Sequence, residues 1–214
     1  MATISPVRIA NMALSNIGAR SNIESFTEQS AEAQQINLWY DFSRLSTLEA
    51  YDWNFARKRL DLALHQDDPP EGQWAFRYQY PADCIKAREI ENPTIISQPN
   101  TLFDPTVFDT SDAIPFEVES SFSGTSNSIL TDMPEATLVY TFDQEQTSMF
   151  TPYFVKAFSF HLASQIAIAI TGKIALQDSM FEKWMQLMLQ AQMFDANERV
   201  DPPPRDTDWI RGRT

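Results

Sequence analysis

Lysine and arginine are missing from a long central stretch of the chain. Between Glu89 and Val155 there is no Lys or Arg, whereas the same 67 residues, called here the acidic window, hold eleven Asp and Glu residues. The window carries most of the formal net charge of −13. A surface built from it would repel polyanions, which counts against ordinary DNA-binding, RNA-binding and anionic-membrane functions. It is either a solvated acidic loop region or a surface past which a polyanion slides without binding.

Cysteine and glycine are also scarce. The single Cys84 excludes an intramolecular disulfide and leaves too few thiolates for a Cys-based zinc site, which indicates synthesis in a reducing cytoplasm. The five glycines are too scattered to form a phosphate-binding loop, and no Lys follows the turn around Gly124. The first residues do not combine a basic leader with an apolar segment, so we expect no signal peptide.

Histidine occurs only twice. His161 lies in an apolar segment, which favours a core or interface histidine over a general base. His65 stands close to Asp67 and Asp68 and is predicted to be exposed. No metal-binding motif is present, and no spacing of Asp and Glu marks a catalytic carboxylate pair. We therefore expect no enzymatic activity, no cofactor and no metal site.

The two ends of the chain have helical patterns. With 43% hydrophobic residues in 214, the chain can bury a substantial core. A Ser-Pro start and a Gly stop predict a helix over residues 6–18. A second helix is expected near residues 30–51, with Leu38, Phe42 and Leu45 along its apolar face.

Two more helices are expected after the acidic window. The first spans residues 152–171 and ends before Gly172. Because it contains Lys156 and His161, it fits a buried helix better than a membrane span, and we expect no membrane association. The second spans residues 176–197, and its apolar face is predicted to consist of Phe181, Trp184, Met188 and Ala191.

Strand patterns fill the middle of the chain. The aromatic residues at positions 74, 76, 78 and 80 alternate with other residues, which is typical of a strand. Residues 93–115 contain four prolines, which predicts a long irregular loop. In a compact domain, a loop of this length is usually functional or ordered by a partner. Further strands are expected around residues 55–64, 85–90, 116–122, 128–130 and 137–142.

This order of patterns predicts an α+β fold. N- and C-terminal helices form a helical bundle, a β-rich insertion lies between them, and an extended C-terminal arm follows. The predicted parts are residues 1–54 for the N-terminal helices, 55–146 for the acidic β-rich insertion, 147–198 for the C-terminal helices and 199–214 for the arm.

Two groups of residues are candidates for contacts with partners. The arm is either a frayed tail or a docking peptide, since Trp and Arg are common interface anchors; its candidate residues are Arg205, Trp209, Ile210, Arg211 and Arg213. Arg57, Lys58 and Arg59 could touch phosphate, form the solvent face of a strand or donate inter-subunit salt bridges.

Four segments carry a resemblance to a known family. They are Ala-Leu-Ser-Asn-Ile-Gly-Ala from position 13, residues 46–60 with Trp-Asn-Phe-Ala-Arg-Lys, Tyr-Pro-Ala-Asp-Cys-Ile-Lys from position 80, and Phe-Thr-Pro-Tyr-Phe-Val-Lys-Ala-Phe from position 150 with Leu-Ala-Ser-Gln-Ile-Ala from position 162. Together they resemble the tail tubular protein A family of short-tailed phages (podoviruses), the head-to-tail adaptors. Residues 92–135 have no clear counterpart in that family.

The resemblance implies a structural role in the virion neck. It implies a homo-oligomeric ring of about twelve subunits, a dodecamer, beneath the portal, with a tail nozzle protein (tail tubular protein B) below it. Genome DNA would pass through the ring without sequence-specific binding, and the arm would dock onto the portal. An acidic channel wall suits that passage because it offers no counterion-release binding energy; the candidate channel-facing residues are Asp109, Asp112, Glu117 and Glu119.

Two other readings stay open. One is an acidic monomeric binding module or assembly chaperone for a basic partner. The other is a hydrolase with a carboxylate site.

Overall fold

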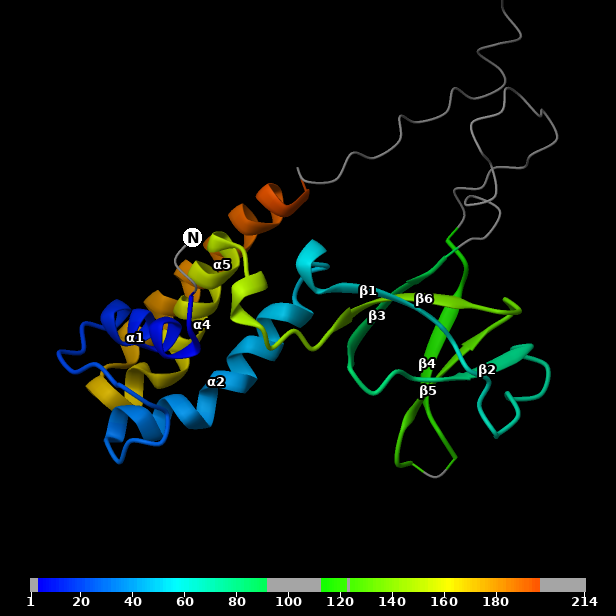
Figure 1. Ribbon diagram of the computed structural model, residues 1–214, viewed down its shortest axis with the longest axis horizontal. Coiled ribbons are helices and arrows are strands. Elements are labelled where there is room, and N and C mark those ends of the chain that lie inside the picture. Colours follow the sequence, from blue (N-terminus) through cyan, green and yellow to red (C-terminus); the bar gives the residue numbers. More distant parts are fainter. Residues whose placement is uncertain (1–3, 92–112, 123, 197–214) are drawn as a thin grey trace, which may run out of the picture.

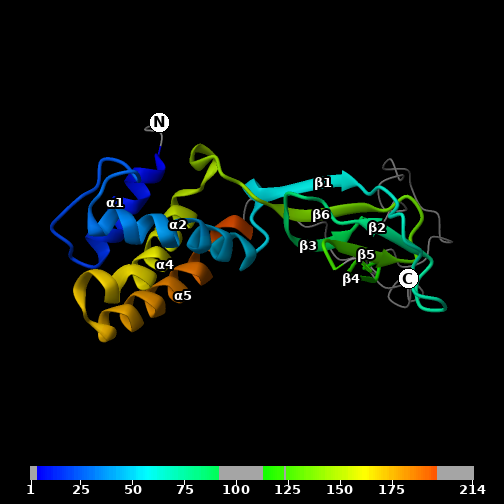
Figure 2. The same ribbon diagram turned by 90° about the horizontal axis from the view of Figure 1, so that it is seen from below.

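The computed structural model describes residues 4–91, 113–122 and 124–196. Figure 1 shows an elongated molecule in which the helices gather at one end and the strands at the other, and Figure 2 shows the same division from below. We call these two regions the helical part and the β part. The α+β class expected from the sequence is confirmed.

The helical part contains four helices within the described residues. Their starts follow from local chemistry: the side chains of Ser5, Ser30 and Thr151 accept hydrogen bonds from the backbone N–H groups three residues on. Gly172 ends one helix at φ 68°, in the left-handed region that favours glycine. The helices are α1 (Pro6–Asn16), α2 (Ala31–Glu49), α4 (Pro152–Thr171) and α5 (Ile174–Ala196).

Helix α4 is the centre of the helical part. It packs against α5, α2 and α1, and its residues Phe154, Phe158 and Leu162 are fully buried. Within the described part of the chain, it is the one helix long and apolar enough to cross a membrane by length and composition. The neighbouring helices cover most of its surface, as is usual for the core helix of a folded domain.

Two three-stranded antiparallel sheets make up the β part. In the first, β6 (Thr137–Phe142) lies between β1 (Arg57–Asp61) and β3 (Cys84–Ile90). In the second, β5 (Asn127–Thr131) lies between β2 (Phe76–Gln79) and β4 (Phe116–Ser120). The two sheets share a small core; its buried residues are Leu62, Tyr78, Ile90, Ile129, Ala136, Leu138 and Tyr140.

Hydrogen bonds join the two parts at the C-terminal end of α2. The Arg88 guanidinium on β3 donates to the backbone oxygens of Glu49 (3.1 Å) and Tyr51 (2.8 Å) and to Thr141 Oγ1 on β6 (2.8 Å). Trp53 holds the segment that connects α2 to β1: its buried indole Nε1 donates to the Thr47 backbone oxygen at 2.9 Å.

The expected apolar face of α2 is wrong in detail. Leu38 and Phe42 are 65% and 52% exposed, and Leu45 is only half-buried. The helix instead buries its opposite side, which combines apolar and polar residues: Ala33, Ile36, Tyr40, Ser43, Arg44, Thr47 and Leu48. On α5, Met188 and Ala191 are buried as expected, Trp184 is half-buried, and Phe181 is exposed.

Candidate functional site

In the part of the acidic window that the structure describes, strands β5 and β6 pair with strands that begin before the window. Its strand β6 lies between β1 and β3, which carry most of the basic residues of the β part. Among the described acidic residues of the window, Glu91 pairs with Arg59 and Asp143 pairs with Arg44. The negative charge of the window is therefore partly neutralised by residues that precede it in the sequence.

Of the four candidate channel-facing residues, Glu117 and Glu119 lie on β4. Because they are two positions apart on a strand, they project from the same face. Both are exposed, yet both have partners: Glu117 accepts a hydrogen bond from Trp74 Nε1 at 3.2 Å, and Glu119 forms an ion pair with Arg77 at 3.2 Å. Asp109 and Asp112 lie outside the described residues.

Arg77 is a feature that the sequence pattern missed. Its side chain is buried, donates to Ser128 Oγ at 3.1 Å and to Glu119, and lies 4.8 Å from the centre of the Phe122 ring. The alternation of aromatic residues predicted a strand here but did not indicate the burial of Arg77. The long-range pair with Glu119 and the cover by Phe122 could not be read from the local pattern.

The three basic residues of β1 are already engaged within the chain. Arg57 pairs with Asp52, Lys58 with Asp83 at 2.7 Å, and Arg59 with Glu91. The hydrogen bond to Asp83 raises the pKa of Lys58, and the hydrogen bond to Asp52 raises the pKa of Arg57. These contacts reduce the charge that the three residues offer to phosphate. Their inter-subunit role stays a prediction.

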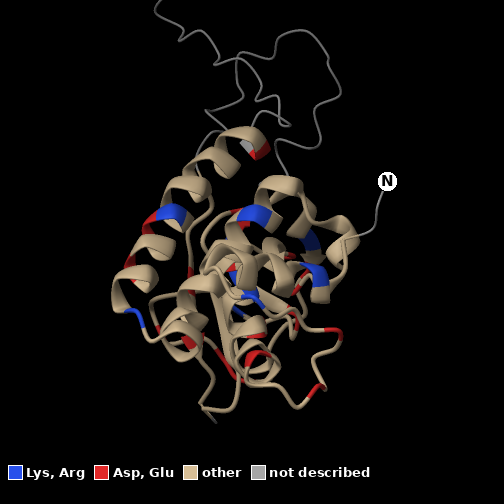
Figure 3. Cartoon of the chain, turned by 90° about the vertical axis from the view of Figure 1, so that its left-hand side faces the viewer, with Lys and Arg blue, Asp and Glu red and all other residues tan. Residues whose placement is uncertain are grey.

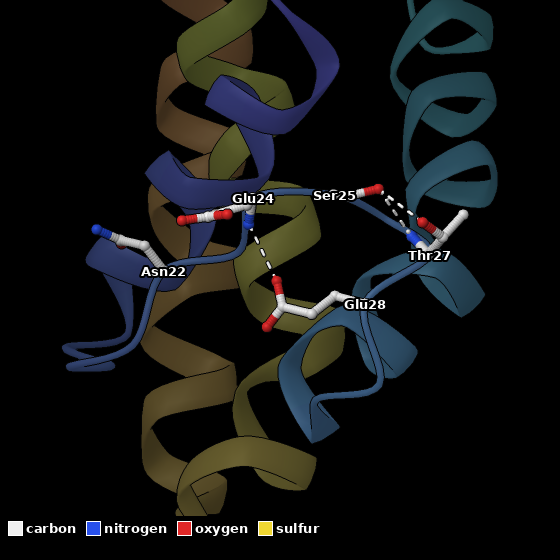
Figure 4. Close-up of a pocket in the computed structure, with 5 residues that line it drawn as sticks. All are labelled: Asn22, Glu24, Ser25, Thr27 and Glu28. Atoms are coloured by element: carbon white, nitrogen blue, oxygen red, sulfur yellow. Dashed lines mark hydrogen bonds between the residues drawn. The ribbon is translucent and has the colours of Figure 1, made fainter.

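A polar surface depression of about 480 Å³ lies in the loop between α1 and α2. Figure 4 shows its lining residues, which are Asn22, Glu24, Ser25, Thr27 and Glu28. Several of them are bonded to one another: the Glu24 N–H donates to Glu28 Oε2 at 3.1 Å, and the two hydroxyls of Ser25 and Thr27 lie 2.8 Å apart. These contacts hold the loop in place.

The two histidines and Cys84 lie in three different parts of the described chain: α4, the turn after β1, and β3. His161 is buried next to Trp184, with ring centres 4.5 Å apart, and burial lowers the pKa of its imidazole. Burial raises the pKa of the Cys84 thiol. His65 is half-buried, contrary to the exposed position expected, and its Nδ1 accepts a hydrogen bond from the Asp67 N–H at 3.0 Å. In the described ranges, no group of three or more His, Cys, Asp or Glu residues could hold a metal.

The C-terminal end of α5 is fixed to the junction between the two parts. Asp195, buried near the end of α5, accepts a hydrogen bond from the Asn54 N–H at 3.2 Å, and its backbone oxygen accepts one from Asn54 Nδ2 at 2.8 Å. The five candidate docking residues of the arm lie outside the described residues: Arg205, Trp209, Ile210, Arg211 and Arg213.

The sites expected from the sequence are thus partly accounted for. The structure brings Glu117 and Glu119 to one strand face and engages the three β1 cations within the chain. A scan against protein-family models and a search of curated proteins each found no match to this chain.

Proposed function

We propose that this chain is a phage structural adaptor that assembles into a ring between the portal and the tail nozzle. In this proposal the four helices form the bundle that builds the body of the ring, and the β part is the insertion that projects from it. The arm from residue 199 onward docks onto the portal, and genome DNA passes through the channel without sequence-specific binding. The protein acts in the virion neck after synthesis in the host cytoplasm.

The observation that carries this proposal is the set of large apolar side chains left exposed on α2 and α5. Leu38, Phe42, Met185 and Leu189 all lie at the surface of a chain that also has a well-formed core. On each helix the two side chains are four residues apart and so lie side by side, and exposed apolar patches of this kind are characteristic of proteins that associate with partners. It favours a subunit of an assembly over an enzyme with an enclosed pocket.

The electrostatics support the same function. The Lys and Arg side chains of β1 and β2 pair with acidic residues of the chain, and Glu117 and Glu119 sit on an exposed strand. DNA affinity depends on unpaired Lys and Arg that displace counterions. A subunit with these pairings can surround DNA without holding it.

The experiment that tests this function is mass measurement of the full chain, alone and mixed with the portal protein from the same genome. The adaptor gives a complex with the portal, whether or not it forms a ring by itself. A chain that stays monomeric and also fails to associate with the portal contradicts the proposal and favours the acidic binding module or chaperone. Deletion of residues 201–214 is expected to leave the fold intact and abolish attachment to the portal; normal attachment would remove the docking role of the arm.

A further inference from the structure

Helix α5 has two exposed flanks with different chemistry. One flank carries Phe181, Met185 and Leu189, which are 40%, 47% and 65% exposed, together with the exposed Asp178 and Glu182. We call this set the acidic apolar face. Its members recur three or four residues apart, so they form one continuous stripe along the helix.

The other flank borders a shallow depression of about 190 Å³ between α4 and α5. We call it the lysine depression; its lining residues are Lys156, Phe160, Lys183, Gln186, Leu187 and Gln190. Lys183 Nζ lies 5.9 Å from the centre of the Phe160 ring. The depression therefore combines two cations with an apolar floor.

The two surfaces point in different directions. At 100° per residue, Lys183 and Leu187 are each about 160° around the α5 axis from Met185. The acidic apolar face is directed toward the α2 side of the bundle, because Phe181 contacts Trp184, which contacts His161, which stacks on Phe42 of α2. The lysine depression lies between α4 and α5 and is lined by residues of these two helices alone.

The two surfaces are complementary in charge. Asp178 and Glu182 form no ion pair within the described ranges, and neither do Lys156 and Lys183. Each surface thus presents two unpaired charges of one sign beside apolar side chains. Figure 3 looks onto the helical end and shows that most positions along the helices there are uncharged.

We propose that the acidic apolar face of one copy docks into the lysine depression of a second copy. Such a contact is heterologous, since it joins two different surfaces, and repetition of it produces a closed ring or a helical filament. The inference deepens the self-association in the proposed function and rests on it. It assigns the contact between subunits to α4 and α5, leaving the arm and the β part free for other partners.

Charge reversal on each surface tests whether these two surfaces meet in the contact between copies. One variant carries Asp178→Lys with Glu182→Lys, and the other carries Lys156→Glu with Lys183→Glu. Each variant alone should associate at least about tenfold more weakly than the unaltered chain, because two exposed ion pairs become repulsive. An equal mixture of the two should restore association, because the reversed face of the first variant attracts the reversed depression of the second, and the two unaltered surfaces attract each other. Association of either variant alone at the unaltered level, or a mixture no better than its components, overturns the proposal.

Cysteine cross-linking gives a second readout that needs no stable ring. In a Cys84→Ser background, the exposed Met185 and Gln186 are each replaced by Cys in separate chains, and Glu71→Cys in an exposed turn of the β part serves as the control. With a short bifunctional maleimide at high protein concentration, cross-links between the Met185→Cys and Gln186→Cys chains should exceed all others at least threefold. Dominant cross-links between two Met185→Cys chains would show a symmetric contact, and equal yields a random one; either result overturns the proposal.

The outcome of these tests separates the inference from the proposed function. If the Met185→Cys chain cross-links to the Gln186→Cys chain but the protein forms no complex with the portal, the adaptor function alone is contradicted. If the protein forms the portal complex but these cross-links are absent, only the assignment of the contact to these two surfaces is contradicted.

Discussion

Arg44 and Asp143 form an ion pair that fastens helix α2 to the segment following strand β6. The Arg44 guanidinium is buried, and it also donates to the Gln144 backbone oxygen at 3.0 Å and lies 3.6 Å from Asp41. Burial alone would lower the pKa of Arg44, but the hydrogen bond and charge of Asp143 outweigh it and raise that pKa. A cation on a helix is thus matched by an anion from the acidic window, 99 residues away in sequence.

Replacing Arg44 is expected to destabilise the chain more than replacing its partner. Arg44→Ala leaves a void and removes every hydrogen bond of the guanidinium, which should lower the free energy of unfolding by about 2–4 kcal/mol. Asp143→Asn keeps an acceptor in place on a partly exposed residue and should cost about 1 kcal/mol. Urea denaturation followed by circular dichroism measures both. Equal losses in the free energy of unfolding would show that the burial of Arg44 adds nothing to the effect of removing its side chain.

Two tryptophans with the same type of hydrogen bond are expected to respond differently to truncation. Trp53 Nε1 donates to the Thr47 oxygen in the core, whereas Trp74 Nε1 donates to Glu117 at the surface. Trp53→Phe leaves a buried carbonyl with one bond fewer and a small cavity, for a loss of about 2–3 kcal/mol. Trp74→Phe should cost less than about 1 kcal/mol because water replaces the donor. A larger loss for Trp74→Phe in thermal unfolding would contradict this account of the junction.

Charge reversal at the two acidic residues of β4 is expected to affect the stability of the chain to different degrees. Glu119→Lys places a second cation against the buried Arg77 and should lower the free energy of unfolding by about 1–3 kcal/mol. Glu117→Lys loses one exposed hydrogen bond and should change stability by less than about 0.5 kcal/mol. Chemical denaturation distinguishes the two.

This difference decides which variant can test the channel. If Glu117 faces the channel, Glu117→Lys should slow DNA ejection from the particle without destabilising the subunit, because the new cation can bind phosphate. Glu117→Gln is the matched control that removes the charge at the same position and introduces no cation. Unchanged ejection kinetics for Glu117→Lys would place β4 away from the DNA.

Local sequence signals predicted the elements of this fold better than they predicted its surfaces. Ser30, Thr151 and Gly172 act on neighbouring backbone groups, so their effects are readable from a few residues. The strand of residues 137–142 was likewise expected from the local sequence.

The burial of particular side chains depended on distant partners. The predicted stripe of Leu38 and Phe42 has the period of a helix but faces outward. Helix α2 instead buries the side that carries Arg44, which pairs with Asp143 after β6. The same limit hid Arg77, which is buried by Glu119 and Phe122 from another strand and its following turn. Hydrophobic periodicity alone cannot distinguish a face packed on the core from one left for a partner.

The stability of the helical part is expected to fall as the pH drops through about 6.5, because of His161. Burial lowers the pKa of His161 in the folded chain, whereas in the unfolded chain it titrates near 6.5. Below that pH the unfolded chain takes up a proton that the folded chain does not. The free energy of unfolding then declines by up to about 1.4 kcal/mol per pH unit until the pKa of folded His161 is reached, and above about pH 7.5 the effect disappears.

Substitution of each histidine assigns this pH dependence. His161→Gln should remove the decline between about pH 7 and 5, whereas His65→Gln, on the half-buried turn of the β part, should retain it. Denaturation midpoints across this pH range, recorded for both variants and the unaltered chain, provide the measurement. Persistence of the full decline in His161→Gln would mean that another group controls acid stability. Its loss in that variant alone would show that the packing of His161 against Trp184 and Phe42 keeps the imidazole neutral.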